Sequence, residues 1–385
     1  MNRLGTMIFA LASTLFAQSV HAEWTPAKRL SWTSGGSYRP AIVADASGGL
    51  HVAWYDYGET ANQEIFYIRS TDGGSTWQPR QRLTWTEGGS FNPALAVDLS
   101  DNIHLIWEDS PSGMRDIFYR KSTDGGTTWT AGQRLTWTFG TSSNPDIAVD
   151  PSGHLHVAWY DSTPGNPEIY YKRSTDGGAS WETNKRLTWT SAYSRYPALA
   201  ADASGHLHLV YEDLSSGYSD AYYKKSTNGG TTWAASRRIT WTSSNYFEPD
   251  MAVDSSNNPH AVWNAGPPGN EEVYYRKSTD GGTTWTASQL LSLNSGGSYY
   301  PAITTGPSNN LQLVWFDYTP GNAEIFYKKS TAGGDAWTSN QRITWTSGNS
   351  MTPAIAVDAW GIIHVVWTDN TPGNEEIFYK KYMHL

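Results

Sequence analysis

The 385-residue sequence contains no cysteine, and only 16% of its residues are charged. Without cysteine the chain has no disulfide bond, no thiol nucleophile and no lipid-carrying thiol, so its stability has to come from packing. The formal net charge of −9 argues against a surface for nucleic acid or for an anionic membrane. After residue 22 no segment shows the 3.6-residue hydrophobic period of an amphipathic helix. These absences argue against a helical bundle, a coiled coil and a disulfide-stabilised scaffold.

Long apolar runs are also lacking, with one exception at the N-terminus. A short basic region around Arg3 precedes a mostly apolar stretch over residues 4–17, and small residues follow up to Ala22. This pattern predicts a signal peptide over residues 1–22 that is cleaved near Ala22, and the apolar run is too short to span a bilayer. We therefore expect a secreted or periplasmic protein, without membrane insertion, in which residues 23–385 form a single domain. Its oligomeric state is left open.

Glycine, proline and aromatic residues are abundant, which suits many short strands joined by tight turns. A proline followed by a short apolar run occurs seven times. The spacing between successive copies is 53 residues once and then 52 residues five times. The seven prolines are Pro40, Pro93, Pro145, Pro197, Pro249, Pro301 and Pro353. A period this constant predicts a repeat architecture.

Four strands are expected in each repeat. In the third copy they cover residues 145–150, 154–160, 168–173 and 185–190, separated by turns rich in glycine, proline and aspartate. Four antiparallel strands in each repeat of this length predict an all-β, seven-bladed β-propeller. The last copy ends after its third strand, at residues 376–381, whereas residues 28–33 match the fourth-strand pattern. We therefore expect the N-terminal strand to complete the last blade and remove its exposed edge.

A hairpin with a recurring sequence joins the third and fourth strands of the repeat. Its first copy reads Ser70-Thr-Asp72-Gly-Gly74-Ser-Thr76-Trp77. Full copies lie at residues 122–129, 174–181 and 278–285, and looser ones at 226–233 and 330–337. The aspartate can accept backbone N–H groups inside the turn, and glycine supplies positive φ. The pattern resembles the Asp-box, or bacterial neuraminidase repeat, of sialidase-like propellers. This resemblance implies the propeller fold and places the Asp-boxes on the face away from the active site.

The opposite face carries the loops between blades, and there one position differs in every copy. The residue before the blade-opening proline is, in chain order, Arg39, Asn92, Asn144, Tyr196, Glu248, Tyr300 and Thr352. A position that serves only the scaffold would repeat. This position is therefore either unimportant or the place where a ligand is recognised.

Three arginines, Arg39, Arg115 and Arg195, lie in loops of this variable face rather than at recurring strand positions. Sialidases bind a carboxylate with three arginines and use a Tyr–Glu nucleophile pair and an aspartic acid/base. The resemblance therefore implies Arg39, Arg115 and Arg195 as carboxylate-binding candidates and Asp56, Glu248 and Tyr300 as catalytic candidates. Tyr246 is the alternative to Tyr300 as the partner of Glu248.

Two features depart from the sialidase pattern. The ring has seven blades instead of six, and Tyr55-Asp56-Tyr57 stands where the family carries its second arginine. We therefore expect a non-catalytic module that binds a glycan or an extracellular protein. The near-perfect similarity of the seven repeats also favours this expectation, because a catalytic pocket for one substrate usually makes the blades diverge. The alternative is an exo-sialidase-like glycosidase that acts on an acidic glycan.

Three further patterns have a structural and a functional interpretation. One histidine recurs on the second strand of six blades; a single imidazole per blade favours satisfied core histidines over a metal site. One tryptophan recurs at the end of the fourth strand; we expect it to pack between blades, with a sugar-binding surface as the alternative. The loop from Asp161 to Glu168 offers oxygen ligands for Ca²⁺, but such side chains more often bond their own backbone. No metal or cofactor is predicted.

Overall fold

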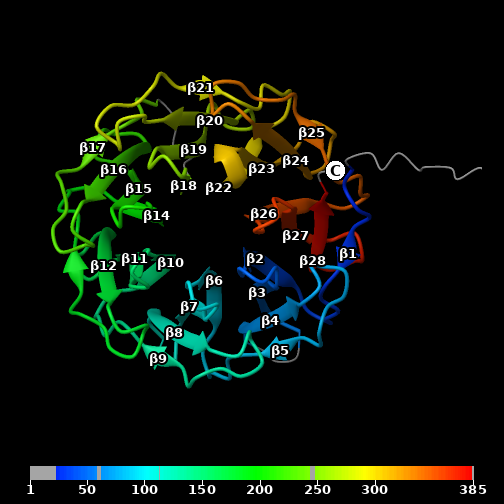
Figure 1. Ribbon diagram of the computed structural model, residues 1–385, viewed down its shortest axis with the longest axis horizontal. Helices are drawn as coiled ribbons and strands as arrows, with labels where there is room; N and C mark the ends of the chain where they lie inside the picture. The colour runs from blue at the N-terminus through cyan, green and yellow to red at the C-terminus, as the bar shows by residue number, and fades with distance from the viewer. Residues whose placement is uncertain (1–22, 59–61, 112, 243–247, 384–385) are drawn as a thin grey trace, which may run out of the picture.

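The computed structural model describes residues 23–58, 62–111, 113–242 and 248–383, which form a ring of seven four-stranded antiparallel sheets around a central axis (Figure 1). The predicted signal peptide lies outside the described residues. In the described part of the chain, no helix is long and apolar enough to cross a membrane.

In blades 1 to 6 the four strands follow one another in sequence from the axis outward (Figure 1). Blade 1 contains β2 (Ser37–Ala44), β3 (Leu50–Asp56), β4 (Glu64–Ser70) and β5 (Gln81–Arg82). Blade 2 contains β6 (Ser90–Val97), β7 (Ile103–Asp109), β8 (Asp116–Ser122) and β9 (Gln133–Arg134). Blade 3 contains β10 (Ser142–Val149), β11 (Leu155–Asp161), β12 (Glu168–Ser174) and β13 (Lys185–Arg186). Blade 4 contains β14 (Ser194–Ala201), β15 (Leu207–Asp213), β16 (Asp220–Ser226) and β17 (Arg237–Arg238).

The remaining three blades repeat this order. Blade 5 contains β18 (Asp250–Val253), β19 (Pro259–Ala265), β20 (Glu272–Lys277) and β21 (Gln289–Leu290). Blade 6 contains β22 (Ser298–Thr305), β23 (Leu311–Asp317), β24 (Glu324–Ser330) and β25 (Gln341–Arg342), with the 3₁₀ turn η1 (Pro307–Asn309) between its first two strands. Blade 7 contains β26 (Ser350–Val357), β27 (Ile363–Asp369) and β28 (Glu376–Tyr382), and its outermost strand is β1 (Lys28–Arg29). The seven-bladed propeller is therefore confirmed.

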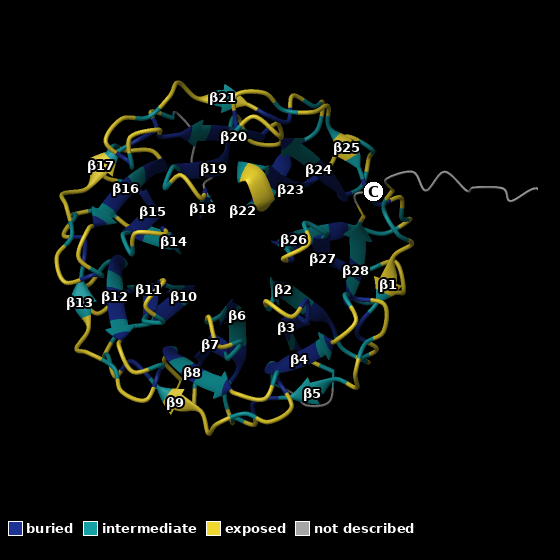
Figure 2. Cartoon of the chain, in the orientation of Figure 1, coloured by how far each residue is buried: buried dark blue, intermediate teal, exposed yellow. Residues whose placement is uncertain are grey.

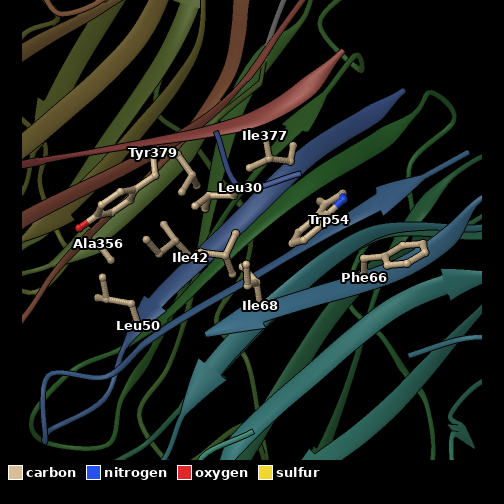
Figure 3. Close-up of a cluster of buried hydrophobic side chains, with 11 residues drawn as sticks. Leu30, Ile42, Leu50, Trp54, Phe66, Ile68, Ala356, Ile377 and Tyr379 are labelled. Atoms are coloured by element: carbon tan, nitrogen blue, oxygen red, sulfur yellow. The ribbon is translucent and has the colours of Figure 1, made fainter. Parts of the chain in front are cut away.

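The N-terminal strand closes the ring as predicted. Lys28 lies opposite Tyr379 and Arg29 opposite Phe378 in the antiparallel pair of β1 and β28. Leu30, which follows β1, is buried between blades 7 and 1 together with Ile377 and Ile42 (Figure 3). The two ends of the chain are thus joined by backbone pairing and by a shared apolar core.

The closure extends to Trp24, which the sequence analysis did not assign to any role. In the other blades the Asp-box tryptophan packs edge-on against a tyrosine of the preceding blade, as Trp129 does on Tyr67 with ring centroids 5.0 Å apart. Blade 7 has no Asp-box because the chain ends are located there. Trp24 packs on Tyr327 of blade 6 in the same geometry, at 5.1 Å. A residue ahead of the first strand therefore replaces the missing seventh tryptophan.

The outermost strands are shorter than predicted. The expected strand over residues 185–190 is reduced to Lys185–Arg186. Beyond it, the amide of Leu187 still donates to the carbonyl of Ile169 at 2.7 Å, but the amide of Ile169 donates to the Thr188 hydroxyl at 2.8 Å. A side chain has replaced the backbone partner, so the regular ladder ends at Arg186.

The Asp-boxes are internally bonded turns, as their composition predicts. In the first box, one Asp72 carboxylate oxygen accepts the Thr76 amide at 2.8 Å, and the other accepts the Thr76 hydroxyl at 2.6 Å. These bonds hold the pKa of Asp72 at about 2. The second glycine of the box adopts positive φ, and in the second box a Cβ at Gly126 would clash with the hydroxyl of Tyr67. The glycine therefore leaves space for the tyrosine of the preceding blade to pack against the box.

The recurring histidines are core residues, as expected. In blade 1 the His51 ring lies 2.6 Å from the Tyr67 hydroxyl and 3.1 Å from Asp45. The same Asp–His–Tyr contacts recur at His104, His156, His208, His260 and His364. In blade 6, Gln312 accepts the tyrosine hydroxyl instead. Both ring nitrogens make contacts inside the blade, although Nε2 of His260 only approaches Asp254, at 3.3 Å, without a hydrogen bond. These contacts support the structural interpretation.

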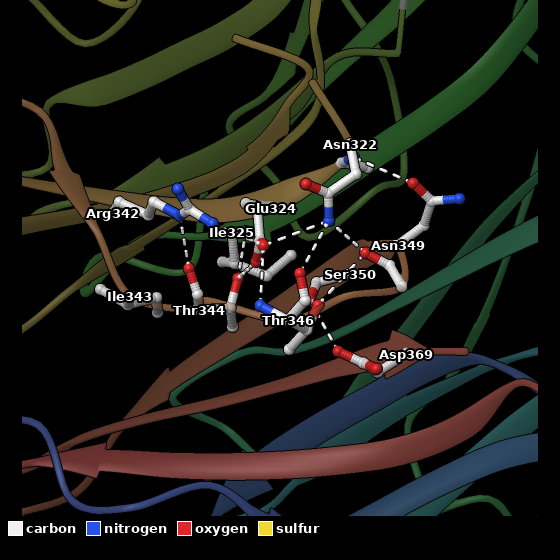
Figure 4. Close-up of polar contacts among 12 residues, drawn as sticks. Asn322, Glu324, Ile325, Arg342, Ile343, Thr344, Thr346, Asn349, Ser350 and Asp369 are labelled. Atoms are coloured by element: carbon white, nitrogen blue, oxygen red, sulfur yellow. Dashed lines mark hydrogen bonds and ion pairs between the residues drawn. The ribbon is translucent and has the colours of Figure 1, made fainter. Parts of the chain in front are cut away.

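A polar staple holds each outer strand to its blade. In blade 6, buried Glu324 accepts the Arg342 guanidinium at 2.7 Å and the Thr346 amide at 2.8 Å (Figure 4). In the next blade, the Ser350 hydroxyl donates to Asp369 at 2.7 Å. The same arginine–carboxylate pair recurs in blades 1, 2, 3, 4 and 7. In blade 5, where Leu290 replaces the arginine, Glu272 accepts the Ser292 hydroxyl and the Asn294 amide instead.

Replacing Leu30 by alanine is expected to lower the free energy of unfolding by about 2–5 kcal/mol, because Leu30 is only 2% exposed in the core shared by blades 7 and 1. Chemical denaturation monitored by tryptophan fluorescence would measure the loss. Leu99, which is 79% exposed, supplies the control; its alanine variant should differ from the unsubstituted protein by less than about 0.5 kcal/mol. Equal stability of the Leu30 and Leu99 variants would contradict the closure.

Candidate functional site: the axial pocket

Each blade places one side chain at the ring axis, within its innermost strand or, for Glu248 of blade 5, two residues before it. In blade 1 the pairing of β2 with β3 shifts register between Tyr38 and Ala41, at the blade-opening Pro40, which has no N–H to donate. The residue before the proline, Arg39, takes a left-handed backbone conformation with φ of 48°. The same conformation recurs with φ between 47° and 51° at Asn92, Asn144, Tyr196, Tyr300 and Thr352. Non-glycine residues rarely adopt it, so its repetition marks a position that the fold holds in place.

These residues meet in a pocket of about 290 Å³ on the axis. Its wall contains the whole variable ring: Arg39, Asn92, Asn144, Tyr196, Glu248, Tyr300 and Thr352. The seven blade-opening prolines complete the wall together with Asp146, Asp250, Ala198 and Ala302. The position that differs between repeats is therefore the position that lines the pocket.

Three of the predicted site residues lie together in this pocket. Arg39 Nη2 donates to the Tyr300 hydroxyl at 3.0 Å, and its guanidinium lies 5.4 Å from the centre of the Tyr300 ring. Tyr300 is in turn hydrogen-bonded to Glu248. The three residues come from blades 1, 6 and 5 and form one connected group.

The electrostatics of this group centre on Glu248. Burial raises the pKa of Glu248 to about 7, although Arg39 favours its charged form. Burial and the neighbouring Glu248 also raise the pKa of Tyr300, so that hydroxyl stays protonated. Glu248 can therefore accept or release a proton near neutral pH, next to a fixed cation and a hydrogen-bond donor.

Two acidic residues of the pocket were missed by the sequence reasoning. Asp146 and Asp250 occupy the position after the blade-opening proline, where the other five blades carry alanine. Each carboxylate crosses to the next blade: Asp146 accepts the Leu199 amide at 2.6 Å and Asp250 accepts the Ile303 amide at 2.8 Å. Burial raises their pKa values to about 6 and about 7. The sequence does carry a signal for them, because these two aspartates interrupt an otherwise constant Pro-Ala pattern.

The other predicted residues lie outside the pocket wall. Arg115 pairs with buried Glu108 at 2.9 Å, and Arg195 pairs with buried Glu212 at 2.8 Å. Each guanidinium is therefore neutralised by its own carboxylate. A single arginine, Arg39, contributes to the described wall.

Asp56 is buried within blade 1 and makes contacts that the other blades repeat. It accepts the Ser37 hydroxyl at 2.6 Å and the Trp54 indole N–H at 3.2 Å. The same Ser–Asp bond recurs at Asp109, Asp161, Asp213, Asp317 and Asp369. These contacts give Asp56 a role in joining two strands rather than a place at the pocket.

A second set of variable residues lies next to the first. Its members follow the aromatic residue in the second strand of each blade and are, in chain order, Tyr55, Glu108, Tyr160, Glu212, Asn264, Phe316 and Thr368. Glu108 accepts the Asn92 side-chain amide at 2.7 Å and the Asn144 backbone amide at 2.6 Å, and thereby fixes two pocket residues from adjacent blades. This set was also missed, although six of its seven members precede an aspartate.

The tryptophans at the ends of the outer strands are not packed between blades, which corrects the sequence interpretation. Their exposed fractions lie between 63% and 70%. They are Trp32, Trp85, Trp137, Trp189, Trp241 and Trp345, called the rim tryptophans below. The packing role belongs instead to the second-strand tryptophans, such as Trp54 and Trp159, which are fully buried.

Fold and repeat together define a sialidase-like Asp-box propeller. A family model described as a BNR repeat-like domain matches residues 86–313. This match covers more than half of the sequence, so the chain belongs to the BNR repeat-like family.

Several characterised proteins are similar to this chain. A xyloglucanase of a Paenibacillus species is 31% identical in an alignment 208 positions long, which covers 45% of this chain and 19% of the enzyme. A xyloglucanase of Acetivibrio thermocellus is 29% identical in an alignment 252 positions long, which covers 57% of this chain and 28% of the enzyme. The chain thus spans less than a third of either relative.

Solved structures show the same fold at low sequence identity. A Hadza microbial sialidase superposes with a TM-score of 0.55 at 17% identity, over 90% of this chain and 65% of the sialidase. An ulvan lyase, solved with a disaccharide of glucuronate and sulfated rhamnose, superposes with a TM-score of 0.64 at 13% identity, over 91% of this chain and 95% of the lyase.

Glu248 is expected to titrate near pH 7, and Arg39→Gln should raise the titration midpoint by roughly one pH unit, because the guanidinium favours the carboxylate. Carbon-13 NMR of labelled glutamate side chains would follow the titration, with Glu248→Gln to assign the signal. Arg237→Gln, which removes an exposed arginine outside the pocket wall, should leave the midpoint unchanged. A midpoint near the ordinary glutamate value in the unsubstituted protein would contradict the pocket electrostatics.

Proposed function

We propose that this protein is a secreted, non-catalytic propeller that binds a terminal acidic sugar of a glycan in the axial pocket. The observation that carries the proposal is the convergence of all seven variable residues on that pocket, with Arg39, Tyr300 and Glu248 bonded together in its wall. Secretion rests on the signal-peptide pattern of residues 1–22.

The chemistry of the wall suits a sugar. The side chains of Asn92, Asn144 and Thr352 supply donors and acceptors for hydroxyl groups. A guanidinium has five N–H donors, so Arg39 can hold Tyr300 and a sugar carboxylate at the same time. A volume of about 290 Å³ is at the small end for ligand pockets and suits a single sugar unit better than a long chain.

Binding without turnover fits the placement of the remaining candidates. Arg115 and Arg195 are occupied by Glu108 and Glu212, so they do not complete a three-arginine clamp. Asp56 is hydrogen-bonded to Ser37 and Trp54 and does not line the pocket, so it is not placed to act there as the acid/base.

A glycosidase remains the second candidate, because one observation favours it. Glu248, with its pKa raised to about 7, is hydrogen-bonded to Tyr300, and such a carboxylate can take the proton of an attacking tyrosine hydroxyl. The sialidases and the ulvan lyase among the structural neighbours act on acidic glycans, which supports an acidic sugar under either candidate.

Titration calorimetry with sialyllactose and with a glucuronate-terminated oligosaccharide would test the proposal on the full mature chain. We expect binding of at least one of them, weakened about tenfold or more by Arg39→Ala, because a charged hydrogen bond contributes about 1.5–3 kcal/mol. Arg237→Ala should bind normally. A lack of binding at millimolar concentrations of both sugars would refute the proposal. Robust hydrolysis of a fluorogenic sialoside that Arg39→Ala and Glu248→Gln abolish would establish the glycosidase instead.

Binding of the acidic sugar is expected to tighten as the pH falls from 8 to 5.5, by roughly tenfold. The carboxyl groups of Glu248, Asp250 and Asp146 have pKa values of about 7, 7 and 6, so they are charged at pH 8 and repel an anion. Protonation at lower pH removes this repulsion, while Arg39 keeps its charge. Affinities measured across this range would check the direction. The variant Asp146→Asn/Asp250→Asn should show a flatter profile, and an affinity that rises with pH would contradict the assignment.

A further inference from the structure

The rim tryptophans form a repeated surface feature that the axial pocket does not use. Each follows the outermost strand of its blade in sequence. These outermost strands lie at the margin of the ring (Figure 2). Each keeps about two-thirds of its surface exposed, whereas the second-strand tryptophans of the same repeats are buried. Single exposed apolar side chains are common on protein surfaces, but six exposed tryptophans at equivalent positions of one repeat form a regular pattern.

Each rim tryptophan is held in a fixed position by an arginine of its own strand. In blade 6, the Arg342 guanidinium lies 5.7 Å from the centre of the Trp345 ring and donates from Nε to the Thr344 carbonyl at 2.7 Å. The same arginine–tryptophan distance is 5.5–5.7 Å in blades 1, 2, 3, 4 and 7. An aromatic surface that is already ordered loses little conformational entropy when a ligand packs on it.

The arginine does not make this surface strongly cationic. Arg342 is paired with buried Glu324 at 2.7 Å. Equivalent pairs of 2.5–2.9 Å accompany the rim tryptophans of the other five blades. Because the charge of each arginine is balanced, the ring it holds is better suited to a neutral partner than to an anion.

A concave surface adjoins at least one rim tryptophan. A pocket of about 310 Å³ lies where blades 6 and 7 meet, and its wall includes Trp345, Trp367, Phe378, Thr346, Thr371 and Pro372. Lys380 also contributes; its ammonium donates to the Ile343 carbonyl at 2.6 Å and lies 5.6 Å from the Trp345 ring. Trp345 remains 66% exposed with these neighbours in place. Aromatic rings beside threonine hydroxyls match a pyranose, which has C–H groups on its faces and hydroxyls at its edge.

The distribution of the rim tryptophans favours a chain-like ligand over a protein partner. One tryptophan per blade, each accompanied by a charged pair, gives separate small apolar surfaces instead of one contiguous patch. A polysaccharide with repeated sugar units can contact several such surfaces at once, and its affinity then exceeds that of a single contact.

We propose that the rim tryptophans are a second, multivalent binding site, which packs on neutral β-linked pyranose units of a polysaccharide. This site is separate from the axial pocket and does not depend on the function proposed for it. Blade 5 lacks the site, because Leu293 replaces the tryptophan and Leu290 replaces the arginine.

Nitrogen-15 NMR of the indole N–H groups, with cellohexaose added to the full mature chain, tests the proposal. We expect shifts confined to the indoles of the rim tryptophans, assigned through single Trp→Leu variants. Trp345→Leu copies the residue that blade 5 already tolerates, so the variant is expected to fold, and it should abolish the shift of that one indole. The matched control is Trp360→Leu, because Trp360 is 65% exposed and lies beside the Asp-box of blade 1, away from the rim.

Retention on immobilised cellulose oligosaccharides measures the multivalent effect. The triple variant Trp85→Leu/Trp189→Leu/Trp345→Leu should lower the apparent affinity tenfold or more, and Leu293→Trp combined with Leu290→Arg should raise it by adding a seventh site. Arg39→Ala should change neither result, which separates this test from that of the axial pocket. Absence of indole shifts at 10 mM cellohexaose, or shifts that require an anionic oligosaccharide, would overturn the proposal.

Discussion

The structure depends on edge-on contact between one tryptophan and one tyrosine across every boundary between blades. A blade of four strands has two apolar faces, and it is stable only when both are covered by neighbours. In six of the seven blades the tyrosine contacts the Asp-box glycine and tryptophan of the next blade and also binds the core histidine of its own blade. The chain ends interrupt this series once, between blades 6 and 7, and there Trp24 supplies the missing ring. Because the series is closed, no blade is left with an uncovered face.

Because these contacts between blades are constant, the side chains at the axis can differ from blade to blade. In six of the seven blades the residue before the blade-opening proline adopts a left-handed conformation, which the backbone of its blade holds in place, and the tryptophan–tyrosine contacts between blades do not use its side chain. Arginine, asparagine, tyrosine and threonine therefore all occupy that position with φ within a few degrees of one another. A scaffold that repeats can thus carry an asymmetric pocket, in which Arg39, Tyr300 and Glu248 from three blades meet.

The two proposed sites differ in the physical basis of their selectivity. The axial pocket presents one cation among carboxyl groups with raised pKa values, so charge and pH govern what enters it. At the rim, the charges are paired and the aromatic surface is repeated, so shape and the number of contacts govern binding. A protein with both would attach to a neutral chain at its margin and recognise an acidic terminal sugar at its centre.

The sequence alone determined the seven blades, their four strands, the closing role of residues 28–33 and the Asp-box turns, because each depends on local residue types repeated at a constant period. It also indicated the variable position before each proline. Only the tertiary structure decided which variable residues act together. Arg39, Glu248 and Tyr300 are far apart in the chain and adjacent at the axis, whereas Arg115 and Arg195 are occupied by Glu108 and Glu212. Likewise, the exposure of the rim tryptophans depends on the neighbouring blade, because it is the packing between blades that leaves these rings uncovered.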